Sequence, residues 1–312
     1  MELRDEQSLQ VAKLYYRGGL SQSEVAAEMG LSRPTVAKLL QHAKTRGYVT
    51  VEIHDPREDG DELGQRLMER YGLEDVRLVF SPRGDEDTLT EGLGRVGAKM
   101  LHELVHDDGM SVGISWGNTM HAVARHMQPK SVAGVEIVQL KGGHSHSIRV
   151  TNDMDTLKRI SAAFGAETLS LPLPVIFDSA EAKEIVEKDR HISSILNAGR
   201  HADLAVFTVG AVSRDSLLMN LGYLSEEEIH VLERQAVGDA CSRFYTADGE
   251  VASPAIDART IGISLSELKA IPQRFMVAGG LQKMAAIDTA LRMKLATHVV
   301  IDKETANRLL QL

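Results

Sequence analysis

Residues 110–127, MSVGISWGNTMHAVARHM, join an apolar run to an amphipathic segment through a polar, glycine-containing turn. The apolar run predicts a buried strand, and the segment from Asn118 predicts a helix. Helices and strands alternate in this way from about Asp61 onward, which is typical of an α/β fold. The other expected helices are ELGQRLMERYG and TLTEGLGRVGAKMLHELVH, and the other expected strands are DVRLVF, VEIVQL, DLAVFTVG, QRFMVAGG and THVVIDK.

The totals of the chain predict a globular protein of two domains. Its 312 residues suit one large and one small domain, and its 43% apolar and 25% charged residues are ordinary for such a protein. The single cysteine, Cys241, excludes an internal disulfide and fits a reducing compartment. The start MELRDEQSLQ does not read as a signal peptide, and no apolar run approaches the roughly 18 residues of a membrane span. We therefore expect a cytoplasmic protein.

The first 50 residues predict a separate module of three helices. The segments 21–30 and 32–47 each begin at a serine N-cap and end at a glycine, and Glu24 completes a capping box with Ser21. A first helix is expected in DEQSLQVAKLYYRGG, and the three together predict a helix-turn-helix. We expect Leu9, Ala12, Leu14 and Tyr16 on the apolar face of the first helix, and Ala26, Gly30, Val36 and Leu39 at the small-residue, turn and core positions.

The distribution of charge favours DNA as the partner of this module. The whole chain carries a net charge of −9, whereas residues 1–50 carry seven Lys and Arg against five Asp and Glu, a net charge of +2. A positively charged N-terminal segment followed by an acidic remainder is typical of a small DNA-binding domain joined to a larger effector domain. In the third helix we expect Arg33 to contact guanine and Ser32 a phosphate, with Thr35 and Lys38 beside them in the exposed first turns; Lys44 and Arg46 would meet the backbone.

These observations predict the following organisation. Residues 1–53 form the DNA-binding domain, and the alternating segment YVTVEI at its end is expected to be the strand of a small wing. The polar segment 54–60 is a linker. Residues 61–312 form the α/β domain, which carries the effector site and the oligomer contacts.

Residues 102–106, HELVH, match the H-E-x-x-H signature of zinc metalloproteases. Two histidines four apart share one face of a helix, and a glutamate between them could activate a zinc-bound water. The longer version of the motif requires a third histidine where this chain has Val112. With twelve histidines in the chain, a chance match to the short motif has odds of roughly a few per cent. We therefore expect no metal site here, and interpret HELVH as the end of a helix that packs on the sheet.

The turn after the strand MSVGIS is the first candidate ligand site. Such a turn before a helix presents backbone N–H groups to an anion, and hydroxyl and amide side chains add further donors. We expect Ser115, Gly117, Asn118 and Thr119 to cradle a phosphate. The alternative is an ordinary turn without a ligand.

Lys141 is the second candidate. It follows the expected strand VEIVQL at the carboxyl end, where open α/β sheets bind ligands, and Gly142 lets the backbone approach closely. A partly desolvated lysine has a lowered pKa and can attack an aldehyde to form an imine. The alternative is a surface lysine before a loop.

A third strand, turn and helix occurs in VAGGLQKMAAIDTAL. Lys283 lies in the first turn of that helix, where its charge opposes the helix dipole, so a bound anion is expected beside it and Gly280. Asp203 and Asp257 could accept hydrogen bonds from sugar hydroxyls, and the alternative for each is a helix or strand cap.

Taken in their order along nearly the whole chain, these segments resemble the SorC family of bacterial transcriptional regulators, and within it the deoxyribonucleoside-responsive members. The resemblance rests on LSQSEVAAEMGLSRPTVAKLL, GISWGNTM, QLKGGHSHS, HADLAVFTVG, RFYTADGE, DARTIGISLSEL and MVAGGLQKMAAIDTAL. It implies a Rossmann-like effector domain related to sugar-phosphate isomerases and deaminases. It also implies that Asn118, Thr119 and Lys283 hold phosphate and that Lys141 lies beside the sugar.

The resemblance implies a regulator and no enzyme. Many relatives carry another residue, often arginine, where this chain has Lys141, and a lysine suits the aldehyde of open-chain 2-deoxyribose 5-phosphate. We therefore expect a repressor without a cofactor, acting as a homodimer or homotetramer on operator DNA and released by that sugar phosphate. Two alternatives remain: a regulator answering to a different phosphosugar, and a sugar-phosphate isomerase or aldolase fused to a DNA-binding domain.

Overall fold

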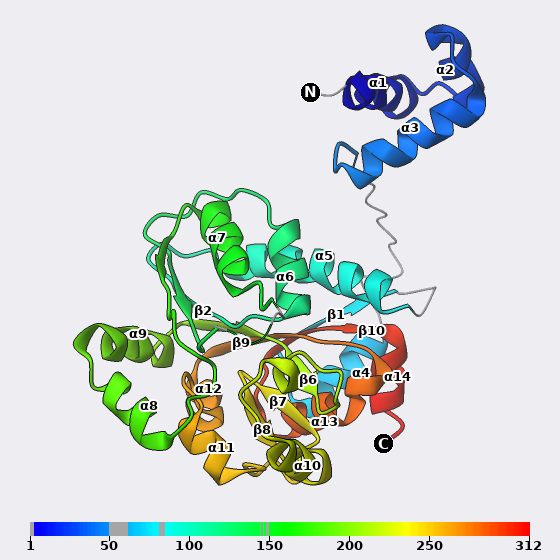
Figure 1. The fold of residues 1–312 in the computed structure, drawn as a ribbon. Coiled ribbons are helices and arrows are strands. Elements are labelled where there is room, and N and C mark those ends of the chain that lie inside the picture. Colours follow the sequence, from blue (N-terminus) through cyan, green and yellow to red (C-terminus); the bar gives the residue numbers. More distant parts are fainter. Residues whose placement is uncertain (1–2, 50–61, 81–84, 144, 146, 148–149) are drawn as a thin grey trace. The chain divides into compact units, whose positions relative to one another are not determined.

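The computed structural model describes residues 3–49, 62–80, 85–143, 145, 147 and 150–312. Contacts within the chain divide it into two compact units, Met1–Gly60 and Asp61–Leu312, and each is considered by itself (Figure 1). Beyond Val49, the expected wing strand lies outside the described residues, and so does the expected linker at 54–60.

The first unit is a bundle of helices around a small apolar core. Its second and third helices are joined by a tight turn at Gly30, whose φ of 64° is left-handed and suits glycine. The capping box of Ser21 and Glu24 is confirmed, since each side chain accepts a hydrogen bond from the other's backbone N–H. Ala26, Val36 and Leu39 are buried as predicted. The elements are α1 (Leu3–Ala12), the π-helical turn η1 (Lys13–Arg17), α2 (Gln22–Met29) and α3 (Arg33–Thr45).

The prediction that Tyr16 faces the core was wrong, because the first helix does not keep the α-helical period. At η1 the backbone N–H of Gly18 bonds to the carbonyl of Lys13, five residues back. This wider turn rotates the residues that follow it relative to α1. As a result Tyr15 packs against the core, while Tyr16 is 41% exposed.

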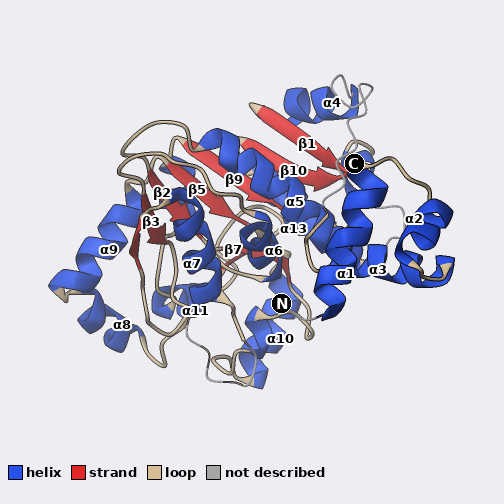
Figure 2. Cartoon of the chain, turned by 90° about the horizontal axis from the view of Figure 1, so that it is seen from above, coloured by secondary structure: helices blue, strands red, loops and turns tan. Residues whose placement is uncertain are grey.

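The second unit is built on a parallel sheet, which confirms the predicted α/β class. Its strands lie in the order β1-β10-β9-β5-β2-β3-β4, and Figure 2 shows the first six side by side. Every neighbouring pair is parallel. The chain order reverses between β2 and β5, and open α/β sheets bind ligands at the carboxyl ends of the strands at such a point. The strands are β1 (Asp75–Val79), β2 (Ser111–Ile114), β3 (Glu136–Gln139), β4 (Glu167–Leu169), β5 (Leu204–Phe207), β9 (Gln273–Val277) and β10 (His298–Asp302).

Helices cover both faces of this sheet. In Figure 1, α5, α6 and α7 lie on one face and α4, α13 and α14 on the other. An apolar core lies on each face of the sheet, and the side chains of β5 alternate between these two cores, as a strand buried on both faces requires. Leu204 and Val206 pack with α5 to α7, whereas Ala205 and Phe207 pack with the opposite layer of helices. The helices are α4 (Glu62–Tyr71), α5 (Glu86–Leu104), α6 (Asn118–His126), α7 (Asp153–Phe164), α8 (Ala180–Glu187), α9 (Arg190–Arg200), α10 (Glu226–Gln235), α11 (Pro254–Arg259), α12 (Leu265–Ala270), α13 (Met284–Arg292) and α14 (Lys303–Leu309), with short 3-10 turns η2 (Leu218–Asn220) and η3 (Leu281–Lys283).

The predicted strand DLAVFTVG is two strands in different sheets. β5 ends at Phe207, and after Thr208 the chain enters a three-stranded antiparallel sheet in the order β6-β7-β8. Gly210 of β6 pairs with Asp239 of β7, and a Cβ on Gly210 would lie 2.2 Å from Asp239 Oδ1. The small sheet consists of β6 (Val209–Ala211), β7 (Gly238–Ala240) and β8 (Arg243–Tyr245).

HELVH ends α5, as predicted. The helix stops at Leu104, Val105 is buried, and His106 lies beyond the helix end. His102 and His106 therefore do not sit on two successive turns of one helix. Glu103 is ion-paired with Arg77 at 3.1 Å, and no group of three or more His, Cys, Asp or Glu among the described residues could hold a metal ion.

Candidate functional site

Three predicted ligand segments meet at the carboxyl edge of the parallel sheet. Ser115 follows β2, Lys141 follows β3, and Gly280 follows β9, and the carboxyl ends of parallel strands lie along one edge. The antiparallel sheet borders this site, because the side chain of Lys141 reaches Ser242 in the turn between β7 and β8.

Lys141 is buried, with a relative exposure of 4%, so the alternative of a surface lysine is excluded. Its Nζ donates a hydrogen bond to Ser242 Oγ at 3.0 Å and lies 3.7 Å from the ring centroid of Trp116. A cation at that distance is attracted by the negative face of the indole ring. Trp116 is fixed in turn, because its Nε1 donates to the carbonyl of Gly142 at 2.7 Å. The amine is thus held by one hydroxyl and one aromatic face.

Burial and charge act against each other on this lysine. Burial lowers the pKa of Lys141, and the nearby acidic groups of Asp239, Cys241 and Asp153 oppose that shift. Burial raises the pKa of Asp239, which Lys141 and Lys283 both counteract through their charges. Burial likewise raises the pKa of the Cys241 thiol to about 11, so it stays protonated at neutral pH. Asp239 is therefore a carboxylate that interacts electrostatically with both Lys141 and Lys283.

The turn after β2 offers unused hydrogen-bonding groups. The hydroxyl of Ser115 is buried, with 1% exposure of the residue, and no hydrogen-bond partner of normal geometry is found for it among the described residues. It lies beside the Cys241 thiol and acts to lower the pKa of that thiol. Gly117, with φ 143°, is the N-cap of α6 and has no side chain to satisfy the first N–H groups of the helix. Thr119 is buried and Asn118 is exposed in that first turn. The positive end of a nine-residue helix and an unpaired hydroxyl therefore face the same edge of the sheet.

Lys283 ends η3 and is the N-cap residue of α13. Burial lowers the pKa of its ammonium group, and the charges of Glu86 and Asp239 oppose the shift. No hydrogen bond or ion pair of its side chain is found within the described part of the chain. A cation at a helix N-terminus is unfavourable unless an anion accompanies it, which fits a phosphate site.

Two glycines of the predicted site, Gly142 and Gly280, also have roles in the packing of the chain. The N–H of Gly280 already donates to Asp302 Oδ1 at 2.8 Å and to Thr305 Oγ1 at 3.1 Å, so it is not free for a ligand. A Cβ on Gly142 would lie 2.2 Å from the carbonyl oxygen of Pro174. Glycine is required at 142 by the neighbouring backbone.

The prediction for Asp203 was wrong. It precedes β5, and its Oδ2 accepts the N–H of Ser111 at the start of β2. Both residues lie at the amino edge of the sheet, and a four-residue strand separates the two edges by roughly 10 Å. Asp203 joins two strands and cannot reach a ligand beside Lys141.

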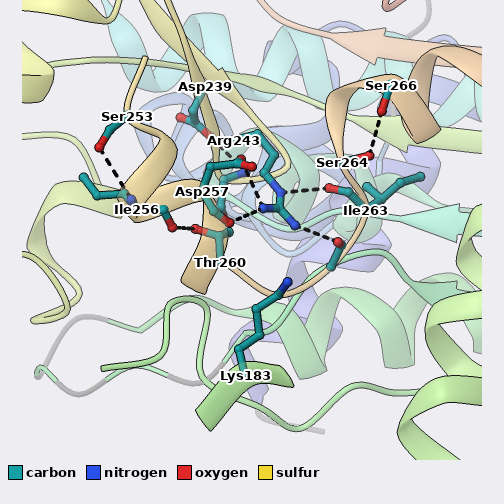
Figure 3. Close-up of polar contacts among 12 residues, drawn as sticks. Lys183, Asp239, Arg243, Ser253, Ile256, Asp257, Thr260, Ile263, Ser264 and Ser266 are labelled. Atoms are coloured by element: carbon teal, nitrogen blue, oxygen red, sulfur yellow. Dashed lines mark hydrogen bonds and ion pairs between the residues drawn. The ribbon is translucent and has the colours of Figure 1, made fainter. Parts of the chain in front are cut away.

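Asp257 is held by a buried arginine that the sequence did not single out. Arg243 donates to Asp257 at both the carbonyl (2.7 Å) and Oδ1 (3.1 Å), and to the carbonyls of Ile263 (3.1 Å) and Gly262 (2.8 Å). Figure 3 shows this guanidinium between α11 and the segment that follows it. Because Gly262 forms a β-bridge with Lys141, the arginine fixes one wall of the site. A contact between Asp257 and a sugar hydroxyl stays a prediction.

The predicted DNA-contact residues share one exposed surface of the first unit. Ser32, Arg33, Thr35 and Lys38 are all exposed at the start of α3. Ser32 Oγ accepts the N–H of Thr35 at 3.3 Å as the N-cap and also bonds to its Oγ1. Arg46 is ion-paired with the buried Asp5 at 3.2 Å. Arg33, Lys38 and Lys44 therefore carry the charge available to DNA on this helix.

No described helix is long and apolar enough to cross a membrane.

The chain matches two known family models. Residues 55–311 match the family model of a sugar-binding domain, and residues 3–60 match that of the MarR family. The chain is 48% identical to the deoxyribonucleoside regulator of Bacillus subtilis, over 98% of this chain and 97% of that protein. It is 27% identical to the sorbitol operon regulator of Klebsiella pneumoniae, over 97% of each.

Solved structures show the same architecture. The crystal structure of the full-length sorbitol operon regulator SorC from Klebsiella pneumoniae superimposes with a TM-score of 0.76 at 25% identity and covers 97% of both chains. A DeoR family transcriptional regulator from Listeria monocytogenes gives a TM-score of 0.72 at 29% identity, over 80% of this chain and 98% of that one. The relatives named here are regulators of transcription.

Proposed function

Because the chain belongs to the SorC family of transcriptional regulators, with a helix-turn-helix domain and a sugar-binding domain, we propose that 2-deoxyribose 5-phosphate is the ligand that controls its DNA binding. The protein is a regulator of transcription and no enzyme. The observation that carries the choice of sugar is the buried amine of Lys141, held against Trp116 at the carboxyl edge of the sheet. The name of the Bacillus subtilis relative agrees with that choice.

The phosphate would be bound at the turn after β2. Ser115, Asn118 and Thr119 supply side-chain donors there, Gly117 leaves the N–H groups of α6 open, and Lys283 supplies a positive charge. A dianionic phosphate would stabilise both the helix end and the partly buried ammonium group of Lys283. The sugar would then extend from this turn toward Lys141.

The open-chain form of 2-deoxyribose 5-phosphate carries an aldehyde at C1, which a neutral amine attacks. The new bond joins Lys141 Nζ to C1, and one proton passes from the nitrogen to the aldehyde oxygen to give a carbinolamine. Its C–O bond then breaks, the hydroxyl leaves as water with the second proton of the nitrogen, and a C=N bond forms between Nζ and C1. Burial favours the neutral amine that this reaction needs, since it lowers the pKa of Lys141.

The protein would act as a repressor that leaves its operator when the sugar phosphate binds. Such control requires the ligand to bind the DNA-free arrangement better than the DNA-bound one. One helix-turn-helix reads few base pairs, so we propose a homodimer or homotetramer on a palindromic operator.

A panel of phosphosugars tested by thermal shift on the full chain would identify the ligand. We expect 2-deoxyribose 5-phosphate to raise the melting temperature at lower concentration than ribose 5-phosphate or glucose 6-phosphate, because ligand binding to the folded state stabilises it. Lys283→Gln should weaken the binding of that ligand by about 1.5–3 kcal/mol, the range for a hydrogen bond to a charged group. Lys269→Gln, at the exposed end of α12, is the matched control and should bind as the wild type does. A larger shift with another phosphosugar would reassign the effector.

The DNA-binding surface makes a separate prediction. Arg33→Ala should weaken binding to a DNA duplex selected with the full chain by about 1–3 kcal/mol and make the protein less selective for the base sequence. The reason is that a guanidinium group donates two hydrogen bonds to guanine O6 and N7. Lys44→Gln should instead weaken the binding of all DNA sequences equally and reduce the slope of log affinity against log salt concentration by about 1. Anisotropy titrations with selected and scrambled duplexes at several salt concentrations measure both. Arg33→Lys keeps the charge, so an unchanged base preference in that variant would contradict the role of the fork.

A further inference from the structure

We propose that Ser242 is a positioning residue, which holds the Lys141 amine where it can attack the sugar aldehyde. This inference rests on the imine proposed above and extends it to a residue outside the predicted site. Ser242 Oγ is the acceptor of the hydrogen bond from Lys141 Nζ at 3.0 Å, and Ser242 is itself 1% exposed. Within the described residues, no other side chain accepts a hydrogen bond from this amine.

The turn that carries Ser242 has a conformation that its residues do not favour. Ala240 of β7 pairs with Arg243 of β8, so Cys241 and Ser242 form a two-residue hairpin loop. Their φ angles are 49° and 66°, both left-handed. Loops of this kind favour Asn-Gly or Asp-Gly, since residues with a Cβ pay a steric cost there. A serine in the position that suits glycine is tolerated only where surrounding contacts determine the conformation.

Those contacts come from both strands of the hairpin. Asp239 Oδ2 accepts the backbone N–H of Ser242 at 3.1 Å, which fixes the loop from its first strand. Arg243 fixes it from the second strand through its bonds to Gly262, Ile263 and Asp257. The backbone of Ser242 is therefore fixed from both strands, and its hydroxyl points to Lys141.

This arrangement restricts the amine in two directions. One N–H of Lys141 is directed at Ser242 Oγ, and the face of the Trp116 ring closes a second side. Attack on an aldehyde requires the nitrogen lone pair to face the carbonyl carbon, and orienting a reacting group contributes to rate mainly in this way. Without the hydroxyl, the four-carbon lysine chain would sample other rotamers within the site.

Ser242→Gly is the variant that isolates the hydroxyl. Glycine suits a φ of 66°, so the hairpin keeps its conformation while Oγ is lost. Lys294→Gly is the matched control: Lys294 also has a left-handed φ of 62°, and its side chain bonds to the carbonyl of Tyr71 and not to the site. Ser242→Ala, which removes the same hydroxyl and keeps the Cβ, is the second variant if melting of the glycine variant shows a loss of fold.

The reaction can be followed on the full chain in two ways. Trp116 is the single tryptophan and lies against the amine, so its fluorescence reports imine formation after mixing with 2-deoxyribose 5-phosphate. Trapping with cyanoborohydride and mass measurement of the intact protein counts the adduct. Binding of 2-deoxyribitol 5-phosphate, which has no aldehyde, reports the non-covalent contacts alone.

We expect Ser242→Gly to bind 2-deoxyribitol 5-phosphate as the wild type does and to form the imine at least about tenfold more slowly, even at high pH where the amine is neutral. A residue that acted only through charge would shift the pH midpoint of the rate and leave its high-pH plateau unchanged. An unchanged plateau in Ser242→Gly, with the wild type trapped at Lys141, would overturn the role of Ser242 alone. A wild type that binds the sugar phosphate and is never trapped would overturn this role together with the imine.

Discussion

Lys141→Met is expected to abolish the covalent adduct with 2-deoxyribose 5-phosphate completely. Methionine is unbranched and of similar length, so it can keep the packing against Trp116 while removing the nucleophile. After reduction with borohydride in the presence of the ligand, the wild type should gain the mass of one reduced sugar phosphate per chain and the variant none. Because the bond to C1 is lost, the concentration of ligand needed for half-maximal release of DNA should rise by at least about tenfold.

Two controls make this result specific. Lys269→Met removes an exposed lysine at the end of α12 and should be labelled as the wild type is. Peptide mapping of the labelled wild type should place the added mass on Lys141. A Lys141→Met variant that still gains this mass, or a mapped adduct on a different lysine, would refute the assignment of the nucleophile.

Arg243→Met is expected to destabilise the second unit by about 3–5 kcal/mol, the cost of breaking a buried ion pair by removing one partner. The guanidinium satisfies the carbonyls of Gly262, Ile263 and Asp257 and pairs with the Asp257 carboxylate, and methionine can satisfy none of them. Urea unfolding followed by Trp116 fluorescence measures this unit specifically, since the single tryptophan lies in it.

The matched control is Arg234→Met on the exposed surface of α10. Surface substitutions of this kind change stability by about 0.5 kcal/mol or less. Arg243→Lys keeps the charge but cannot reproduce the several donors of the guanidinium group. Its free energy of unfolding should therefore lie between those of the wild type and the methionine variant. A loss below about 1 kcal/mol in Arg243→Met would show that the network in Figure 3 does not support the wall of the site.

The sequence predicted the elements whose patterns are strong and local. The capping box of Ser21 and Glu24, the core positions of the helix-turn-helix and the main parallel strands each depend on residues close together in the chain. Lys141 was found for the same reason, because an apolar run ends directly before it. The first helix shows the limit of this reasoning, since periodicity cannot reveal the π-helical turn that exposes Tyr16.

The residues that the sequence missed act across long separations. Ser242 and Asp239 lie about a hundred positions from Lys141. Asp239 is in β7 and Ser242 is in the loop before β8, and these strands of three residues carry no recognisable alternation. The Cys-Ser hairpin offered no signal, because turn rules favour glycine or asparagine at left-handed positions. Asp203 was misplaced because a carboxylate before a strand lies at its amino end, whereas the site is formed by groups after the strands.

The most direct test of the proposed control is the release of DNA by the sugar phosphate. The full chain is bound to a duplex selected by its own affinity and titrated with 2-deoxyribose 5-phosphate, with ribose 5-phosphate and inorganic phosphate in parallel. Our account predicts that 2-deoxyribose 5-phosphate dissociates the complex at concentrations where the other two leave it intact. A complex that stays bound while thermal shift shows the sites filled would contradict it.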